Sequence, residues 1–304
     1  MRQIIFVLGP TGVGKSDFAT ELALQTQSVI VNCDSQQVYQ DLDIGTAKPT
    51  SEQMNLVPHF FYSFVPAGVQ YTAGEYRRDV LNFLDERKDL KCFVFVGGSG
   101  FYAQSLETEM YSIGKANESV RNQLMEDFAK VGLDGLFQEL VQSDPIYAEK
   151  IGPRDRYRLL RSVEIVRATG KTPTTLFAES GRGANPLLEK GFKVRKIALY
   201  MDKEALRNRI RKRTENMLKG GLIEETHSLL NRGLGDWRPL NSIGYKEVRE
   251  WLAGQVKRED LVEKIVTSTM QLCKRQMTWL KRKSEMEWVN AGNFLDRSER
   301  VLSY

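Results

Sequence analysis

Histidine and cysteine are scarce in this chain of 304 residues, which contains two histidines and three cysteines. The cysteines are odd in number, far apart and never spaced as CxxC, so we predict neither a disulfide framework nor a cysteine-based zinc site. Two histidines are too few for a histidine-rich metal centre, and they leave few starting points for a Ser-His-Asp triad. These absences exclude small disulfide-stapled folds and histidine-rich metalloproteins.

Long apolar runs are also missing. No stretch approaches the roughly 18 consecutive apolar residues that a membrane-spanning helix needs. The N-terminus carries one charge and then the short apolar segment Ile4–Leu8, without the long hydrophobic region of a signal peptide. Apolar residues make up 41% and charged residues 27%, which excludes wholesale disorder. We therefore expect a cytoplasmic, globular protein with no membrane partner. Separately, we expect it to be monomeric.

The charge balance is only mildly basic, with 44 basic and 39 acidic residues and a net charge of +5. Such a surplus permits nucleic-acid binding without requiring it. The distribution is more informative than the sum, because basic residues concentrate in residues 150–171, 203–219 and 271–283. These three segments are the candidates for binding phosphate groups.

Short apolar runs alternate with amphipathic stretches in the first hundred residues. Ile4–Leu8, Ser28–Cys33 and Lys91–Val96 are typical of buried strands, whereas Asp17–Gln25 and Ala73–Glu86 have helical spacing. Alternation of this kind predicts a parallel sheet with helices on both faces.

The pattern changes after about residue 114. Only helical periodicity occurs until strand character returns at Val194–Met201, and this stretch is far too long for a crossover loop. We therefore predict an α/β core formed by residues 1–114 and 191–304, with an inserted all-helical domain at 115–190. From Lys203 onward we expect the core to be mostly helical.

A phosphate-binding loop directly follows the first predicted strand. Gly9-Pro10-Thr11-Gly12-Val13-Gly14-Lys15-Ser16 matches G-x-x-x-x-G-K-[ST], with a strand before it and a helix after it. The loop amides and the helix N-terminus would hold a di- or triphosphate, Lys15 would supply a charge, and the Ser16 hydroxyl would ligate Mg²⁺. The expected core is thus a P-loop NTPase-like parallel sheet.

A Walker B carboxylate is not found where a P-loop ATPase needs it. The strand at Lys91–Val96 ends in Gly97-Gly98 rather than Asp, and the one apolar run that ends in an acid, at Asp202, lies late in the chain. This disfavours motors and GTPases and favours a transferase that holds a phosphorylated donor.

Asp34 follows the second predicted strand. Because the carboxyl ends of neighbouring parallel strands share one crevice, Asp34 should face the phosphate loop, where a carboxylate accepts a proton from an incoming nucleophile. The alternative is an Asx turn or helix N-cap. The following residues, Ser35, Gln36 and Gln37, carry groups suited to a nucleobase edge.

Two basic helices add candidate residues. In a helix over 204–219, wheel arithmetic places Arg213 roughly 40° from the centre of the apolar stripe, whereas Arg207 and Arg211 turn toward solvent. A snorkelling arginine paired with an acid is the alternative for Arg213. In a helix over 154–167, Arg154, Arg158 and Arg161 form a stripe without matching acids, which suits RNA phosphates, although a solvated face is the alternative.

Several blocks of this sequence resemble the bacterial tRNA dimethylallyltransferase family, the IPP transferases. The blocks are Gly9–Ser16, Asp34–Tyr39, Asp43–Pro49, Pro58–His59, Gly97–Tyr102, Arg158–Glu164, Arg213–Met217 with Gly221–Leu222, Ile243–Glu247 and Lys274–Trp279. The resemblance implies transfer of the dimethylallyl group from dimethylallyl diphosphate to the exocyclic N6 amine of the adenosine 3′ of the anticodon. The phosphate loop would then hold the donor's diphosphate.

The resemblance also implies residue roles. Thr11 would bond near the bridging oxygen of the leaving group, Asp34 would take the amine proton, and Lys15 and Arg213 would bind the diphosphate. The anticodon stem-loop would contact Asp34, Ser35, Gln36, Gln37, Ser99, Arg121, Tyr157, Arg158, Leu159, Leu160, Arg161, Asn241, Ser242, Ile243, Gly244, Tyr245, Lys246, Lys274 and Arg275. Tyr157 stands where the family usually has Gln, and Ser99 where it usually has Thr.

A stacked adenine has to leave its helix to react, so we expect it to be flipped into a channel that leads to the phosphate loop. Phe101 or Tyr102 would stack on it, unless they belong to the core. Two other functions fit the same residues. A small-molecule or nucleotide kinase shares the loop and the strand-end Asp, and a non-catalytic RNA-binding protein or RNA-dependent NTPase shares the basic segments.

Overall fold

The computed structural model describes residues 2–108, 118–179, 185–283 and 285–293. It consists of two compact units. The first contains Met1–Glu107 and Leu187–Tyr304, and the second contains Thr108–Pro186. The boundaries expected from the sequence, 115 and 190, lie slightly further along the chain.

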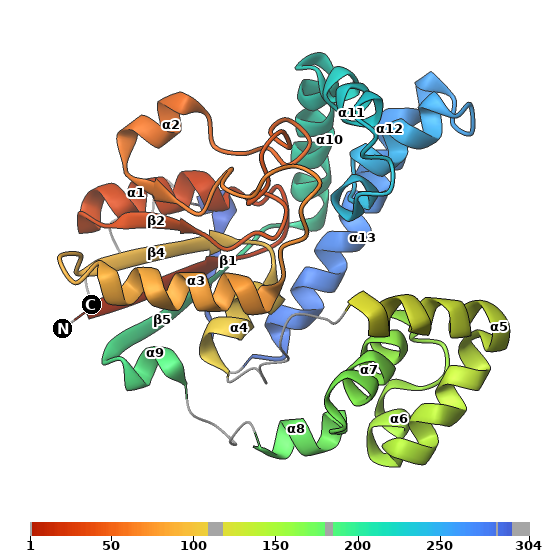
Figure 1. Ribbon diagram of the computed structural model, residues 1–304. Helices are drawn as coiled ribbons and strands as arrows, with labels where there is room; N and C mark the ends of the chain where they lie inside the picture. Colours follow the sequence, from red (N-terminus) through yellow and green to blue (C-terminus); the bar gives the residue numbers. More distant parts are fainter. Residues whose placement is uncertain (1, 109–117, 180–184, 284, 294–304) are drawn as a thin grey trace. The chain divides into compact units, whose positions relative to one another are not determined.

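The first unit is built on a sheet of six parallel strands in the order β3-β2-β4-β1-β5-β6 (Figure 1). The strands are β1 (Arg2–Leu8), β2 (Val29–Asn32), β3 (His59–Phe60), β4 (Cys92–Gly97), β5 (Phe192–Tyr200) and β6 (Glu287–Asn290). This confirms the predicted parallel α/β core. The sequence did not predict β3 and β6, because both are short edge strands that lack a continuous apolar run.

Helices cover both faces of this sheet (Figure 1). The helices of the core are α1 (Lys15–Thr26), α2 (Ser51–Leu56), α3 (Ala73–Glu86), α4 (Gly100–Glu107), α9 (Pro186–Glu189), α10 (Lys203–Lys219), α11 (Leu222–Asn231), α12 (Tyr245–Leu252) and α13 (Leu261–Lys281). Three 3₁₀ turns, Arg238–Asn241, Arg258–Asp260 and Ala291–Asn293, complete it.

The alternation of side chains along β1 assigns its two faces. Ile5 and Val7 belong to a buried cluster with residues of α1, α10 and α13. Phe6 points to the opposite face and packs against Phe95 of β4, with ring centroids 5.2 Å apart. On that face Phe83 of α3 meets Phe93 edge to face, at 6.0 Å. Because both faces are buried, the central strands are continuous apolar runs, which is why they were recognisable.

The second unit is helical throughout its regular elements, in the residues that the structure describes. It contains α5 (Glu118–Ser143), which is kinked at Gly132, then α6 (Pro145–Ile151), α7 (Arg156–Thr169) and α8 (Pro173–Glu179). Its buried cluster consists of Leu124, Leu136, Leu140, Ala148, Leu159 and Val163. Arg167 of α7 forms ion pairs with Asp127 and Glu139, at 2.7 and 2.6 Å, and so ties α7 to both halves of α5.

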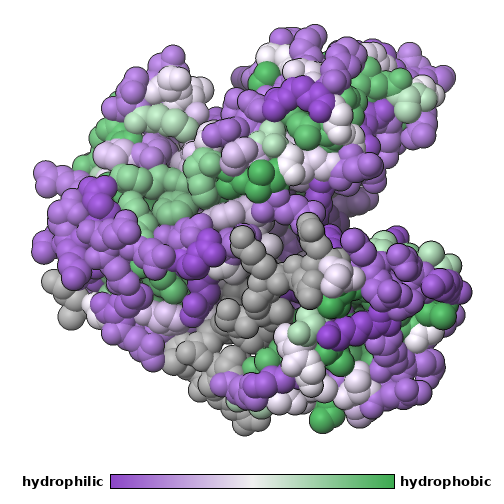
Figure 2. Space-filling model, viewed as in Figure 1, coloured by the Kyte–Doolittle hydropathy of each residue, from purple (hydrophilic) through white to green (hydrophobic). Residues whose placement is uncertain are grey.

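Among the described helices, none has the length and apolar character needed to cross a bilayer. Figure 2 shows one face of the molecule, on which hydrophilic residues predominate and hydrophobic ones form separate patches.

Candidate active site at the carboxyl edge of the sheet

The phosphate loop connects β1 to α1 as the motif predicts. Gly12 and Gly14 have φ angles of 83° and 102°, which side-chain-bearing residues rarely adopt. This backbone path turns the chain into α1, whose first N–H groups have no partner within the helix and face the loop. Lys15 Nζ donates a hydrogen bond to the carbonyl of Pro10 at 2.9 Å, so its side chain folds over the loop.

Lys15 lies in a cluster of charges. Burial lowers the pKa of Lys15 to about 8, and this is the largest influence on it. The nearby carboxylate of Asp34 raises the pKa of Lys15, whereas the guanidinium of Arg213 lowers it further. Two cations close to one carboxylate leave a positive surplus, so this part of the site suits a bound polyanion.

Asp34 is held by the end of β2. Its N–H donates to Asn32 Oδ1 at 2.9 Å, and its carbonyl accepts from Asn32 Nδ2 at 3.0 Å. Asp34 Oδ1 accepts from the N–H of Gln36 at 2.9 Å, so the Asx-turn alternative is correct for this one oxygen. The other oxygen, Oδ2, makes no hydrogen bond to any residue that the structure describes. Asp34 therefore combines a fixed orientation with a carboxylate oxygen that can accept a proton.

The ends of β2 and β4 are joined beside Asp34. Ser99 Oγ accepts from the N–H of Ser35 at 3.0 Å and bonds to Ser35 Oγ at 3.1 Å. Next to them, Gln36 Oε1 is buried without a hydrogen-bond partner in the described part of the chain. A buried acceptor of this kind is costly unless a donor reaches it. The predicted cluster of Asp34, Ser35, Gln36 and Ser99 is thus assembled at one edge of the sheet.

Arg213 of α10 faces this edge, as the helical wheel predicted. It interacts electrostatically with Lys15 and Asp34, and its Nη2 lies 3.4 Å from the carbonyl of Thr46. Burial, the largest influence, lowers the pKa of Arg213. Arg207 and Arg211 instead both pair with Glu263 of α13.

The sequence did not single out two further residues that contact the loop. Gln276 of α13 accepts from the N–H of Thr11 at 3.0 Å with Oε1, and its Nε2 donates to the carbonyl of Gly98 at 3.0 Å. Arg209 Nε donates to the carbonyl of Gly12 at 3.1 Å. Helical spacing could have indicated Arg209, because it precedes Arg213 by about one helical turn and so lies on the same face of the helix. Gln276 lies in the block Lys274–Trp279 that resembles the family, but nothing in that block indicated its contact with the loop, because its partners Thr11 and Gly98 are far away in the sequence.

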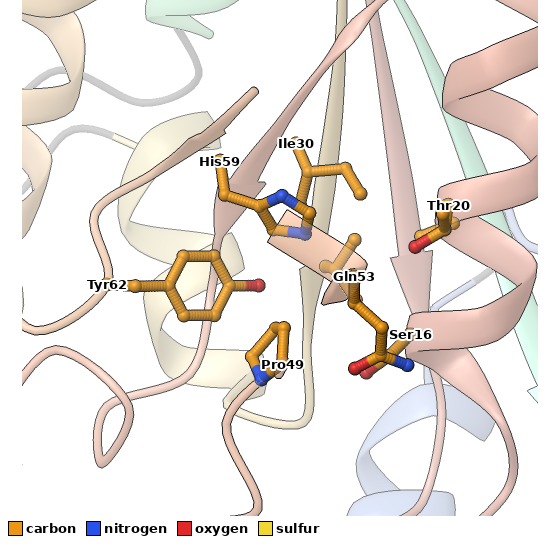
Figure 3. Close-up of a pocket in the computed structure, with 9 residues that line it drawn as sticks. Ser16, Thr20, Ile30, Pro49, Gln53, His59 and Tyr62 are labelled. Carbon is orange, nitrogen blue, oxygen red and sulfur yellow. The ribbon is translucent and has the colours of Figure 1, made fainter. Parts of the chain in front are cut away.

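A small cavity lies on the α1 side of the loop (Figure 3). It is lined by Ser16, Ala19, Thr20, Ile30, Pro49, Gln53, His59, Tyr62 and Val96. His59 Nδ1 donates to the carbonyl of Val57 at 2.8 Å, and the His59 ring lies edge to face with Tyr62 at 5.5 Å. Burial lowers the pKa of His59, and its hydrogen bond and ring contact hold it in the wall of the cavity.

Phe101 and Tyr102, the two candidates for stacking on a base, are separated by the structure. Tyr102 is buried and stacks on Tyr76 with ring centroids 4.3 Å apart, so it belongs to the core. Phe101 is 61% exposed and remains available for stacking.

Most residues of the core that the resemblance assigned to tRNA are accessible. Asn241, Lys246, Lys274 and Arg275 are exposed, and Ser242 and Ile243 are half-buried. Tyr245 requires a correction, because its side chain is fully buried and its hydroxyl donates to Glu225 at 2.5 Å. Gly244, directly before it, is buried as well.

The second unit also requires corrections. Leu159 is fully buried in the unit's hydrophobic cluster and Leu160 packs against that cluster, so Leu159 offers no side chain to RNA. The predicted arginine stripe is not free of acids: Arg158 pairs with Asp155 at 3.2 Å, and Arg161 with Glu164 at 2.8 Å.

Other parts of this unit keep their expected exposure. Arg154 is exposed, but the predicted helix over 154–167 requires a correction, because α7 begins only at Arg156 and Arg154 precedes it. Tyr157 is 64% exposed, and Arg121 of α5 is exposed.

Within the described residues, no three His, Cys, Asp or Glu side chains gather to hold a metal ion. Ser16 is exposed at the first turn of α1. A Mg²⁺ ion usually keeps several waters and takes ligands from substrate phosphates, so a single hydroxyl next to a phosphate loop fits such an ion.

The fold and the site together define a P-loop α/β protein whose phosphate loop faces a strand-end carboxylate. The family model described as IPP transferase matches residues 37–283, and the chain belongs to this family.

Relatives of known name agree with this assignment. The chain is 41% identical to the tRNA dimethylallyltransferase of Bdellovibrio bacteriovorus, over 96% of this chain and 94% of that one. It is 35% identical to the Geobacter metallireducens enzyme of the same name, over 99% and 97%.

Solved structures agree as well. The tRNA isopentenylpyrophosphate transferase of Bacillus halodurans matches with a TM-score of 0.70 and 26% identity, over 99% of this chain and 96% of that one. A eukaryotic dimethylallyltransferase acting on tRNA matches with a TM-score of 0.84 and 26% identity, over 100% of this chain and 78% of that one.

Proposed function

We infer that this chain is a tRNA dimethylallyltransferase, which transfers a dimethylallyl group to an adenosine of tRNA. Family membership and the names of near full-length relatives support the reaction. The observation in the structure that supports it best is the placement of Lys15 and Arg213 beside Asp34, where a leaving diphosphate and a proton acceptor are both needed.

We further propose that the donor is dimethylallyl diphosphate and that the acceptor is the N6 amine of the adenosine 3′ of the anticodon. The allylic C–O bond breaks and its electron pair leaves with the diphosphate. The amine nitrogen forms the new C–N bond and loses one proton, which Asp34 accepts. In this proposal Asp34 Oδ2 receives the proton, while Oδ1 keeps its hydrogen bond to Gln36.

Negative charge grows on the diphosphate as the C–O bond breaks. Interactions that are stronger with the leaving diphosphate than with the bound donor lower the barrier. The loop amides, Lys15 and Arg213 are the groups placed to make them. Thr11 would bond near the bridging oxygen, and Gln276 holds the Thr11 backbone for this task.

We propose Mg²⁺ as a cofactor. Ser16 would hold the ion together with diphosphate oxygens and water, and when bound it would supply further positive charge to the leaving group. The exposure of Ser16 at the start of α1 supports this placement.

The tRNA would bind through basic and polar side chains of both units. We propose contacts to the anticodon stem-loop from both units. They are Lys274, Arg275, Asn241 and Lys246 in the core, and Arg121, Tyr157, Arg158 and Arg161 in the helical unit; Arg161 is half-buried and the others are exposed. We propose that the enzyme acts as a monomer.

One assay tests the reaction and its alternatives together. The protein is incubated with tRNA, Mg²⁺ and dimethylallyl diphosphate labelled in the alkyl group, and the label in RNA is counted with and without ATP. We expect ATP-independent labelling at a single adenosine. Labelling that requires ATP, or phosphorylation of a small acceptor without labelled RNA, would instead identify a kinase. RNA binding without any transfer would indicate a binding protein.

Donor affinity should fall as the pH rises through about 8. Lys15, with its pKa lowered from 10.5 to about 8, is charged below that pH and neutral above it. We expect the dissociation constant of dimethylallyl diphosphate to increase up to about tenfold per pH unit above pH 8. Isothermal titration between pH 7 and 9.5 measures this. In Lys15→Arg the charge persists at every pH, so its profile should be flat. Parallel profiles in both proteins would remove Lys15 as the cause.

Arg158→Ala should weaken tRNA binding and flatten its salt dependence. The Arg158 side chain is 62% exposed, and its surface ion pair with Asp155 contributes little to stability. We expect the slope of log K against log salt to fall by about one, with donor affinity unchanged. Filter binding across a salt series measures the slope. Lys130→Ala, an exposed residue of the same unit, is the control and should leave the slope unaltered. An unchanged slope in Arg158→Ala would place the tRNA elsewhere.

A further inference from the structure

Glu225, in the first turn of α11, makes an unusual set of hydrogen bonds. Its Oε2 accepts from the N–H groups of Asp43 at 3.0 Å and Ile44 at 2.8 Å, and its Oε1 accepts from the N–H of Gly45 at 3.0 Å. One carboxylate thus binds three consecutive backbone amides that lie some 180 residues away in the sequence. The charge makes each of these hydrogen bonds stronger than a neutral one.

Tyr245 completes this arrangement. Its hydroxyl donates to Glu225 Oε1 at 2.5 Å, and its ring lies fully buried against Gly45. A Cβ at position 45 would lie only 2.3 Å from the Tyr245 ring, so only glycine fits there. Glu225 and Tyr245 therefore hold the backbone of Asp43–Gly45 together, Glu225 through hydrogen bonds and Tyr245 through close packing against Gly45.

The next residues of this segment carry carbonyl groups that face the site. Gln37 Nε2 donates to the carbonyls of Thr46 at 3.0 Å and Ala47 at 3.1 Å. Arg213 Nη2 lies 3.4 Å from the same Thr46 carbonyl. Displacement of the segment would therefore move an acceptor that Gln37 and Arg213 share.

We propose that Glu225 is a positioning residue, which holds the Asp43–Ala47 segment so that its carbonyls orient Arg213 toward the diphosphate. This inference rests on the proposed function for its kinetic part. Glu225 acts through Arg213 and touches no substrate. It lies outside every block assigned to tRNA or to the donor.

The test is the conservative substitution Glu225→Gln. A glutamine has one acceptor oxygen and an NH₂ group that repels backbone N–H donors, so at least one of the three amides loses its partner. We expect about a tenfold loss of kcat for prenyl transfer and about tenfold weaker binding of inorganic pyrophosphate, with a smaller loss of tRNA affinity, because Gln37 also donates to this segment. The matched control is Glu224→Gln, which removes the same charge from the neighbouring exposed position of the same helix turn and should behave as wild type.

A double-mutant cycle separates positioning from a merely structural role. In an Arg213→Ala background, Glu225→Gln should add less than a twofold loss, because the group that it orients is gone. Losses that multiply in the double variant would overturn the inference. So would a Glu225→Gln protein that binds pyrophosphate and turns over as wild type.

Pyrophosphate binding keeps this test independent of the reaction. If the wild type transfers no prenyl group but binds pyrophosphate more tightly than Glu225→Gln does, the proposed function fails while the positioning role stands. If pyrophosphate binding does not differ, the positioning role fails whatever the reaction is. Thermal unfolding of each variant shows whether a loss of activity or of pyrophosphate binding is caused by unfolding. If it is, Tyr245→Phe serves as a milder second variant. It removes only the hydroxyl bond to Glu225 and keeps the three hydrogen bonds from the backbone amides, so we expect a smaller loss of pyrophosphate binding.

Discussion

Asp34→Ala is expected to lower kcat for prenyl transfer by a factor of about 10²–10⁴, the usual loss for a missing general base. The amine loses its proton as the C–N bond forms. Asp34 Oδ2 makes no hydrogen bond to any residue that the structure describes, so it is free to accept this proton. Donor and tRNA affinities should change much less, because Lys15, Arg213 and the basic surface remain. Single-turnover kinetics with saturating tRNA and donor measure the chemical step directly.

Asp34→Asn distinguishes proton acceptance from shape. Asn keeps the acceptor for the Gln36 N–H, since Asx turns tolerate both residues, but it has no basic oxygen. It should therefore be as slow as Asp34→Ala. Asp41→Asn, a change at a half-exposed surface pair with Arg232, is the matched control and should stay near the wild-type rate. An Asp34→Asn enzyme with near-normal turnover would exclude Asp34 as the base.

Lys15→Ala is expected to lower kcat/KM for the donor by about 10²–10³, the cost of removing one preorganised group that binds developing negative charge. Lys15 is folded over the loop by its hydrogen bond to Pro10, so its ammonium is already in place before the donor binds. Preorganisation of this kind needs no rearrangement during the reaction, which is why the loss should appear in kcat as well as in KM.

The measurement is steady-state kinetics at pH 7, below the pKa of Lys15, with donor concentration varied at saturating tRNA. Binding of tRNA alone should be unaltered, because Lys15 lies at the loop rather than on the basic surface. A Lys15→Ala enzyme with unchanged donor kinetics would show that the diphosphate binds outside the phosphate loop.

The sequence alone determined the parts of this protein that depend on local patterns. The phosphate loop, the central strands β1, β2, β4 and β5, and the helix α3 were recognisable, because each is a continuous run whose periodicity or spacing reflects its own burial. The position of Asp34 at a strand end and the inward direction of Arg213 followed from the same local geometry.

Only the tertiary structure decided the contacts between distant segments. It placed Gln276 on the phosphate loop, Glu225 on the Asp43–Gly45 amides and Leu159 in a core, and it gave Arg158 and Arg161 acidic partners. A strand as short as β6 became visible only through its pairing with β5. The physical reason is that a polar side chain's partner is set by how elements pack, and residues up to 265 apart in the chain leave no periodic trace of that packing in either segment.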